Sequence, residues 1–305
     1  MFNYVYIIVP SIIVGVLSRL SMLRSDYRQY PSYPQGVFSH LTLGIISASL
    51  GSVAIPAIAE KEFAAVTFLA LAAQQFRDVR SLERQSLDNI EPTELVARGT
   101  AYIEDIAKAF EARNYMTMLS ALITSIIIFI FVKFNIRIEI AVVVGFLVGL
   151  GTVIFFNRYI TREKVADIAE VRAANIVFDG PLLTVNGVFI MNIGLKASQK
   201  IYQERGIAVE IIPNDANAVA TLANLGQRQA IQHNAAILLG IRKDVDEPDF
   251  TPIARRNPHN GNVVMAILPM ELDEKRLVEA VSSTVVLESA KRKPLSTNVG
   301  KKAAE

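Results

Sequence analysis

Residues 91–115 read EPTELVARGTAYIEDIAKAFEARNY, a polar stretch between two hydrophobic blocks of the sequence. Pro92 suits the first turn of a helix, where its missing N–H costs nothing. Apolar residues then recur every three or four positions, at Leu95, Gly99, Tyr102 or Ile103, Ile106 and Phe110. This spacing predicts an amphipathic helix with one apolar face. Because hydrophobic blocks flank the helix, we expect it to lie on the inner face of a membrane, between membrane spans.

The composition predicts a chain that is divided between membrane and water. The 305 residues are 51% hydrophobic, with a mean hydropathy of +0.34, and the apolar residues concentrate before Tyr159. The formal net charge of +2 gives no indication of nucleic-acid binding. The absence of cysteine excludes disulfides, thiolate metal sites and cysteine catalysis. His40, His233 and His259 are isolated from one another, so neither a metal site nor a cofactor is predicted.

Five hydrophobic segments are predicted to cross the membrane, namely residues 4–18, 37–59, 63–75, 116–132 and 139–156. The segment 63–75 is shorter than the roughly 20 residues that a spanning helix needs, so a re-entrant or interfacial segment is the alternative. With five crossings most arginines and lysines between the spans fall on one side, which is the positive-inside pattern. We therefore expect a bacterial inner-membrane protein with its N-terminus outside and its C-terminal part in the cytoplasm.

The predicted spans contain no charged residue near their centres. Ion-coupled transporters usually carry ionisable groups there, so a transporter or channel is the least favoured class of function. The last span contains Gly145 and Gly149, a small-xxx-small spacing that allows helices to approach closely. This spacing is typical of packing within one chain or, alternatively, of a homo-oligomer contact.

From Thr161 onward the pattern predicts a soluble α/β domain with a mixed sheet and helices on it. Helices are expected at residues 163–175, 194–204, 214–230 and 272–281, and strands at 182–185, 188–192, 207–212, 235–241, 262–268 and 284–288. Asn186-Gly187 between two apolar runs is a strong hairpin signal. The basic tail from Lys291 is expected to be disordered.

The expected organisation has five parts. They are three N-terminal spans (1–76), a cytosolic amphipathic helical hairpin (77–115), two further spans (116–157), a cytosolic α/β domain (158–290) and a disordered basic tail (291–305).

Two aspartates are the candidates for catalysis. Asp179 follows three apolar residues and precedes Gly180-Pro181, and Asp215 stands at the predicted start of a helix. Two carboxylates held close together can share a proton and activate water, as in aspartic peptidases. The structural alternatives are a turn residue for Asp179 and a helix N-cap for Asp215.

A third candidate lies in the polar run Asn224-Leu-Gly-Gln-Arg-Gln229. Arg228 is a candidate to bind a small ligand or a nucleotide phosphate. The alternative is an exposed helix face without a ligand.

The run Tyr102-Ile-Glu-Asp-Ile-Ala107 resembles the signature of the YIEGIA family of endospore-forming Firmicutes. The chain carries Asp105 where the signature carries Gly, a difference that we expect to lie on the polar face of the helix. The resemblance implies a membrane protein of the sporulation programme, with N-terminal spans and a cytosolic domain. An aspartic-type membrane peptidase is one activity that the resemblance suggests.

Two functions are therefore weighed ahead of transport. The first is a membrane-anchored regulator or scaffold that binds protein partners, with its contact residues on the signature helix at Arg98, Tyr102, Glu104, Asp105 and Arg113. For these charges the alternative is a solvated helix face in contact with lipid headgroups. The second is an aspartic-type peptidase that acts in the cytoplasm through Asp179 and Asp215.

Overall fold

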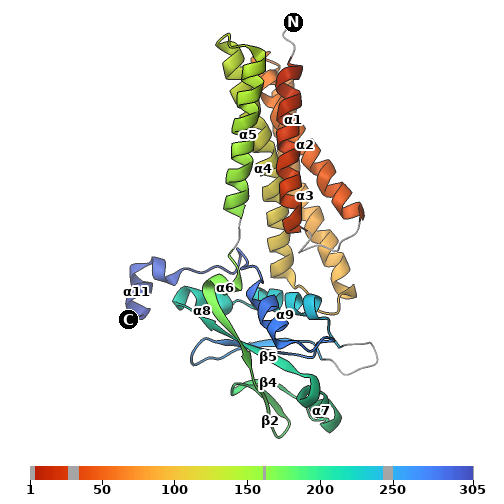
Figure 1. Cartoon of the computed structure of the whole chain (residues 1–305), viewed down its shortest axis with the longest axis vertical. Coiled ribbons are helices and arrows are strands. Elements are labelled where there is room, and N and C mark those ends of the chain that lie inside the picture. Colours follow the sequence, from red (N-terminus) through yellow and green to blue (C-terminus); the bar gives the residue numbers. More distant parts are fainter. Residues whose placement is uncertain (1–3, 27–33, 161–162, 243–249, 305) are drawn as a thin grey trace. The chain divides into compact units, whose positions relative to one another are not determined.

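The computed structural model describes residues 4–26, 34–160, 163–242 and 250–304, and the chain forms two compact units. Unit 1 combines residues 1–85 with 106–161, and unit 2 combines residues 86–105 with 162–305. Figure 1 shows the long helices of unit 1 and the sheets of unit 2. Each unit thus contains two separate parts of the chain, and helix α4 contributes residues to both.

Unit 1 is a bundle of long helices: α1 (Val5–Asp26), α2 (Pro34–Ala59), α3 (Phe63–Ile90), α4 (Thr100–Lys133) and α5 (Ile138–Ile160). Among the described residues, four segments are long and apolar enough to span a membrane: Val5–Leu23, Val37–Ala59, Thr100–Lys133 and Ile138–Arg158. Helix α3 is not one of them, because its second half is charged. By length and composition, four helices of the N-terminal half are therefore suited to cross a membrane. Length and composition do not predict a crossing by α3.

Consecutive helices of the bundle run in opposite directions (Figure 1). Tyr4 at the start of α1 donates a hydrogen bond to Glu60 at the end of α2, with 2.7 Å between the oxygens. Small residues let the backbones approach, since a Cβ atom on Gly15 would lie 2.5 Å from that of Ala48 on α2. Close approach through small residues is the packing mode that membrane helices favour.

Several helix boundaries differ from the predictions. The first span does not end at Ser18, because α1 continues to Asp26. The third predicted span and the amphipathic piece after it form one helix, α3, and the signature helix is continuous with the fourth span in α4. The helix predicted from Pro92 begins only at Thr100, after a 3₁₀ turn (Glu91–Thr93) and an irregular segment in which Gly99 has a φ of 80°. A positive φ is a backbone conformation that glycine adopts without steric cost.

Unit 2 contains two antiparallel sheets. The four-stranded sheet has the order β1 (Ala169–Ala174), β5 (Ile207–Pro213), β7 (Val263–Ile267), β6 (Ile253–Arg256), and the three-stranded sheet has the order β2 (Ile176–Asp179), β3 (Leu182–Val185), β4 (Val188–Asn192). The predicted hairpin at Asn186-Gly187 is confirmed, with Val185 opposite Val188. The prediction of a mixed sheet is wrong, because the strands of both sheets pair antiparallel throughout the described residues.

Strand β7 is the centre of unit 2. All five of its residues are buried, since one face of the sheet packs against helices and the other against the three-stranded sheet. The helices are α6 (Val165–Ile168), α7 (Lys196–Arg205), α8 (Ala216–Leu222), α9 (Leu225–Leu239), α10 (Glu274–Ser282) and α11 (Asn298–Ala304). Residues of α9 and α10 join one apolar core, and Tyr202 of α7 joins the other. A strand covered on both sides reads as a continuous apolar run, which made β7 predictable.

Other predictions for unit 2 are wrong. The apolar run 235–241 is mostly the end of helix α9, since a short apolar run fits a helix or a strand equally well. The predicted helix 163–175 is α6 followed by strand β1, and the predicted helix 214–230 is divided where Asn224 caps a new helix at the amide of Gln227. Residues 284–288 form only an isolated bridge, Val285 with Lys164. The tail predicted to be disordered carries a 3₁₀ turn (Pro294–Ser296) and α11.

Candidate functional site

Helix α9 carries three polar side chains that hold the backbone of distant segments. His233 Nδ1 lies 2.7 Å from the carbonyl oxygen of Val96, so the ring nitrogen is the donor. Gln227 donates to the carbonyl of Val285 at 3.1 Å and accepts the amide of Leu287 at 2.8 Å. Asn234 donates to the carbonyl of Ala280 at 2.7 Å. These bonds satisfy buried backbone groups that no helix or sheet satisfies.

The signature segment packs directly on α9. Tyr102 is buried, and its ring meets that of His233 edge to face, with 6.1 Å between the centroids. A Cβ atom on Gly99 would lie 2.3 Å from Oε1 of Gln229, and one on Gly226 would lie 2.4 Å from the Cβ of Ala101. Such close approach explains why glycine occupies both positions.

The environment of His233 favours its neutral form. Burial lowers the pKa of His233, and the positive charge of Arg98 lowers it further. The hydrogen bond to Val96 and the charges of Glu94 and Glu91 oppose this shift without reversing it. The neutral ring with its proton on Nδ1 is the form that can donate to the Val96 carbonyl.

Asp105 is fully buried and accepts the backbone amide of Glu288 at 2.9 Å. The expectation that Asp105 lies on the polar face of the signature helix is therefore wrong. This part of α4 is covered on more than one side, because Tyr102, Ile103 and Ile106 are buried as well. A buried carboxylate needs hydrogen-bond donors, and the C-terminal segment supplies one.

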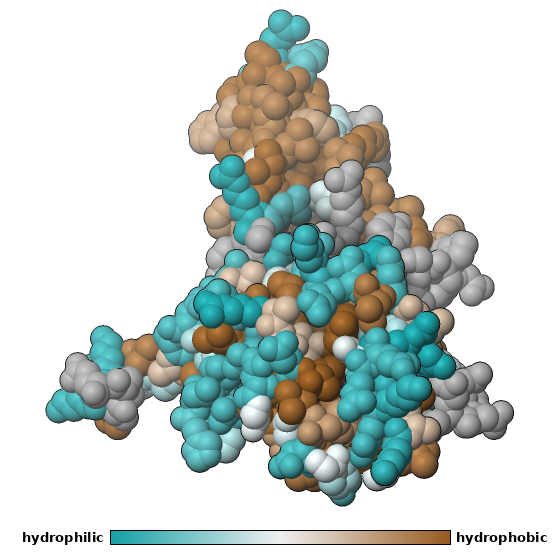
Figure 2. Space-filling model, turned by 60° about the horizontal axis from the view of Figure 1, so that its bottom comes forward, coloured by the Kyte–Doolittle hydropathy of each residue, from teal (hydrophilic) through white to brown (hydrophobic). Residues whose placement is uncertain are grey.

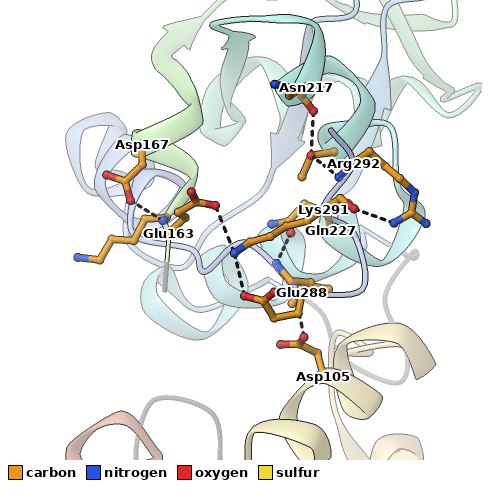
Figure 3. A network of polar contacts seen from close by, with 11 residues as sticks. Asp105, Glu163, Asp167, Asn217, Gln227, Glu288, Lys291 and Arg292 are labelled. Atoms are coloured by element: carbon orange, nitrogen blue, oxygen red, sulfur yellow. Dashed lines mark hydrogen bonds and ion pairs between the residues drawn. The ribbon is translucent and has the colours of Figure 1, made fainter. Parts of the chain in front are cut away.

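Lys291 connects the C-terminal segment to Glu163, two residues before α6. Its ammonium group lies 2.8 Å from a carboxylate oxygen of Glu288 and 3.3 Å from one of Glu163 (Figure 3). Burial by itself lowers the pKa of Lys291, but the hydrogen bonds and charges of Glu288 and Glu163 outweigh burial and raise it. Asp105, Glu288, Lys291 and Glu163 thus join α4, the C-terminal segment and the chain after α5 in one polar network.

A cavity of about 190 Å³ lies beside this network. Its lining includes acidic Glu163, Asp167 and Asp215, basic Lys291, Arg292 and Lys293, and polar Asn217 and Thr221. Several of these groups hold the backbone, since Thr221 accepts the amide of Arg292 and Asn217 accepts that of Leu295. The cavity therefore has a structural frame and walls of both charge signs.

The two candidate catalytic aspartates occupy different elements. Asp215 lines this cavity and N-caps α8, accepting the amide of Ala218 at 2.7 Å. Asp179 is exposed at the end of β2, in the turn that leads to Leu182 of β3 in the same three-stranded sheet. The structure thus gives both residues the local roles that the sequence offered as alternatives. Within the described residues, no group of three acidic or histidine side chains is arranged to hold a metal ion.

The predicted partner-binding residues are mostly buried. Arg98 is 3% exposed and pairs with Glu94 at 2.8 Å, while Arg113 is 3% exposed in unit 1. Glu104 is half-buried. These side chains are therefore more buried than the amphipathic pattern predicted, and they contact the interior of their own unit. Arg228 donates to the carbonyls of Ala254 and Ala223 and is half-buried on α9.

Unit 1 has a buried polar site that the sequence did not reveal. Arg19 is fully buried, and its guanidinium lies 3.1 Å from His40 Nδ1 and 5.4 Å from the ring centroid of Phe110. Arg19 lies beyond the predicted end of the first span at Ser18, but α1 continues to Asp26, so Arg19 is part of this helix, near the end of its apolar segment. A Cβ atom on Gly44 would lie 2.5 Å from Arg19 Cγ, so this glycine makes room for the side chain.

Helix α4 extends this polar site along one face. Asn114 and Thr117 are fully buried, and neither side chain has a hydrogen-bond partner among the described residues. They follow Phe110 at helical spacing, and Ser120 donates to Ser18 of α1 at 3.4 Å. The spacing of these residues alone could have suggested one helix face, but their burial depends on the neighbouring helices.

Comparisons with known proteins bear on both units. The family model described as YIEGIA protein matches residues 7–297. The uncharacterized protein YphB of Bacillus subtilis (strain 168) is 41% identical over 294 residues, which are 96% of this chain and 96% of the relative. No solved structure matches. The similarity thus extends through the membrane helices and the sheets alike.

Proposed function

The chain belongs to the YIEGIA protein family, and from this premise we propose that it is a membrane-anchored regulator or scaffold. In this proposal unit 2 acts on partner proteins in the cytoplasm of a sporulating bacterium. Unit 1 holds unit 2 at the inner membrane.

The observation that carries the proposal is the composite construction of unit 2. Residues 86–105 precede α4 and residues 162–305 follow α5, yet Val96 bonds to His233 and Asp105 bonds to Glu288. Two crossings, α4 and α5, return the chain to the same side. The chain therefore connects unit 2 to the membrane helices through α3, α4 and α5, which suits a membrane-anchored domain.

Contacts within unit 1 support five crossings. Tyr4 and Ile7 pack with Ile128 and Val132, and Tyr4 bonds to Glu60, so the ends of α2 and α4 lie at the same end of the bundle. Helix α3 begins next to Glu60 and reaches Tyr115 and Glu111, at the other end of α4, through Phe76 and Arg80. Five crossings and the basic loops favour an outer N-terminus and a cytoplasmic unit 2.

Cysteine labelling tests this topology, because the chain has no native cysteine. Single variants Lys61→Cys and Lys293→Cys are treated with a membrane-impermeant maleimide on intact cells. Five crossings predict labelling at Lys61 and none at Lys293. If α3 did not cross and unit 2 still lay in the cytoplasm, Lys61 would be cytoplasmic and unlabelled; if instead the N-terminus stayed outside, Lys293 would be labelled. Asn135→Cys, in the turn after α4, is outside whenever unit 2 is cytoplasmic and serves as the positive control for both arrangements of that kind.

The same contacts favour a regulator over a peptidase. Asp215 uses one carboxylate oxygen to cap α8, and Asp179 lies at the end of β2 in the three-stranded sheet. Because the signature residues are buried, we place the partner surface elsewhere on unit 2. Figure 2 shows hydrophobic residues among hydrophilic ones on the side of the molecule that it displays. Val177 and Phe189, both aligned with Thr184 on the three-stranded sheet, are 55% and 48% exposed.

Crosslinking in sporulating cells tests the function. The wild-type chain is expected to capture a specific protein, and the double variant Val177→Ser/Phe189→Ser is expected to lose it together with heat-resistant spore formation. The control is Leu225→Ser, because Leu225 is 62% exposed on α9. An uncleaved protein that accumulates in Asp179→Ala or Asp215→Ala cells, while crosslinking to the partner is unchanged, would favour the peptidase hypothesis over the regulator hypothesis.

A further inference from the structure

Three arginines gather at one edge of the four-stranded sheet. Arg228 lies in the first turn of α9, and Arg255 and Arg256 lie on β6, the edge strand. Arg228 donates to the carbonyl of Ala254, the residue that precedes the other two, at 3.2 Å. This hydrogen bond ties the helix to the edge strand. We name Arg228, Arg255 and Arg256 the arginine cluster.

The positive charges of the cluster act on one another. Burial lowers the pKa of Arg228, and the charges of Arg255 and Arg256 lower it further. Some arginines of unit 2 are paired with carboxylates, since Arg98 lies 2.8 Å from Glu94 and Arg172 lies 2.6 Å from Glu170. Among the described residues, no carboxylate lies within 4 Å of a guanidinium group of the cluster.

The carboxylate nearest to the cluster in strand register is already occupied. Glu210 on β5 is opposite Val264 on β7, which is opposite Arg255 on β6. Two strand spacings separate Glu210 and Arg255, about 9–10 Å. The Glu210 oxygens accept hydrogen bonds from Asn262 at 2.7 Å and Asn186 at 2.8 Å. Glu210 therefore moderates the field of the cluster without forming an ion pair with it.

The cluster also keeps donors available. Arg255 uses only Nε, which donates to the carbonyl of Ile190 at 3.3 Å, and Arg256 makes no hydrogen bond or ion pair in the described structure. Both side chains are exposed, whereas Arg228 is half-buried. Guanidinium groups offer paired N–H donors that match the oxygens of a phosphate group. A multiply charged oxyanion would relieve the repulsion and accept these donors together.

We propose that the arginine cluster binds a phosphate group. Arg255 and Arg256, whose side chains leave opposite faces of β6, contact the phosphate from the two sides of the sheet edge, and Arg228 positions β6 through Ala254 and adds its charge. The site lies outside the apolar row at Val177 and Phe189, so the inference does not depend on the partner surface proposed above. The phosphate belongs either to a free phosphate compound or to a phospholipid headgroup, and the test has one arm for each source.

The test is calorimetric titration of the purified full chain in an uncharged detergent. One arm uses inorganic phosphate and pyrophosphate, and the other uses short-chain phosphatidylglycerol below its micelle concentration. Saturable binding of the inorganic probes assigns the site to a free phosphate compound, and binding of the lipid alone assigns it to a headgroup. Saturation by neither class of probe at millimolar concentration overturns the proposal.

Variants decide whether the cluster is responsible for the binding. The double variant Arg255→Gln/Arg256→Gln is expected to weaken binding about tenfold or more, since two charge-assisted contacts are lost. The control is Arg172→Gln, which removes an exposed arginine from the opposite edge of the same sheet. Equal affinity of the double variant and the wild-type chain overturns the proposal. Arg228 is left intact, because it also holds two backbone carbonyls.

Discussion

The carboxylate of Asp105 accepts the backbone amide of Glu288 at 2.9 Å, across 183 positions of the sequence. Asp105 belongs to the helix that carries the family signature, and Glu288 precedes the lysine that pairs with Glu163. One hydrogen bond thus connects the start of a membrane helix to the C-terminal segment of unit 2. Because Asp105 is fully buried, water does not compete for this bond.

The variant Asp105→Ala is expected to destabilise unit 2. It removes a fully buried acceptor and breaks its part-buried hydrogen bond with the Glu288 amide, which costs about 1–3 kcal/mol. Asp105→Gly recreates the residue of the family signature and costs about 1 kcal/mol more, because glycine disfavours the helix interior. Hydrogen exchange at the Glu288 amide and thermal unfolding in detergent measure both effects. The matched control is Glu204→Gln, an exposed carboxylate on α7, and an equal loss in that variant would contradict the assignment.

The fate of the signature segment shows which parts of the fold were predictable. Hydrophobic runs of spanning length, the Asn186-Gly187 hairpin and the buried strand β7 depend on local pattern, and all were found. The burial of Asp105 depends on a segment that lies far away in the sequence. An i, i+3 pattern assigns such a residue to the polar face, because the pattern counts only one apolar partner surface.

Acidification is expected to weaken unit 2 through His233. Its pKa in the folded chain lies below its ordinary value of 6.5. As the pH falls through 6.5, the unfolded chain takes up a proton before the folded chain does, so the free energy of unfolding decreases. The stabilisation is complete above 6.5 and is lost toward the lower folded pKa. Thermal unfolding followed from pH 8 to pH 5 measures this slope.

His233→Asn identifies the group responsible for that slope. The asparagine amide can still donate to the Val96 carbonyl but does not titrate, so the variant is expected to lose part of the pH dependence. His259→Asn replaces an exposed histidine and is expected to keep the wild-type slope. A full slope in His233→Asn would show that other groups cause the acid sensitivity.

The ion pairs of Lys291 are expected to contribute modestly. Lys291→Met removes both carboxylate contacts but keeps the apolar stem, and the expected loss is about 0.5–1 kcal/mol, because Glu163 and Glu288 are more than half exposed. The loss is expected to shrink at high salt, which screens exposed charges. The control is Lys293→Met, because Lys293 lies two residues away and forms no ion pair with the described residues. If the loss of stability did not depend on salt, it would come from lost packing of the Lys291 side chain and not from its ion pairs.

The predicted catalytic pair separates into two local effects. Asp215→Ala is expected to cost about 0.5–2 kcal/mol through loss of the α8 cap. Asp179→Ala is expected to change stability by less, since Asp179 is exposed at a turn. Under the regulator hypothesis both variants support normal sporulation once their stability is matched by temperature. Sporulation defects of equal depth in both variants, without loss of folded protein, would favour the dyad.

The site residues that the sequence missed share a physical cause. Gln227, Asn234 and Lys291 contact backbone or charged groups that lie 46 to 128 positions away in the sequence, and Arg19 contacts His40 of another helix, 21 positions away. Their residue types are ordinary for an exposed helix or an interface, so no local spacing distinguishes them. Only the packing of neighbouring elements removes water from these groups, so that each of them needs a hydrogen-bond partner within the protein.

Gly149→Ala separates packing within the chain from a homo-oligomer contact. A Cβ atom at this position would lie 2.2 Å from Thr124 Oγ1 of α4 and 2.9 Å from Val14 of α1, and at Gly145 it would lie 2.3 Å from Ile128. Both glycines are buried against helices of the same chain. Gly149→Ala is therefore expected to lower thermal stability by about 1–3 kcal/mol through overpacking, with the oligomeric state unchanged.

The control is Gly151→Ala on the same helix, where a Cβ atom would meet nothing within 4 Å. This variant is expected to be neutral or slightly stabilising. Light scattering after size exclusion in detergent gives the oligomeric state, and a change of mass in Gly149→Ala alone would instead place a second copy at this face.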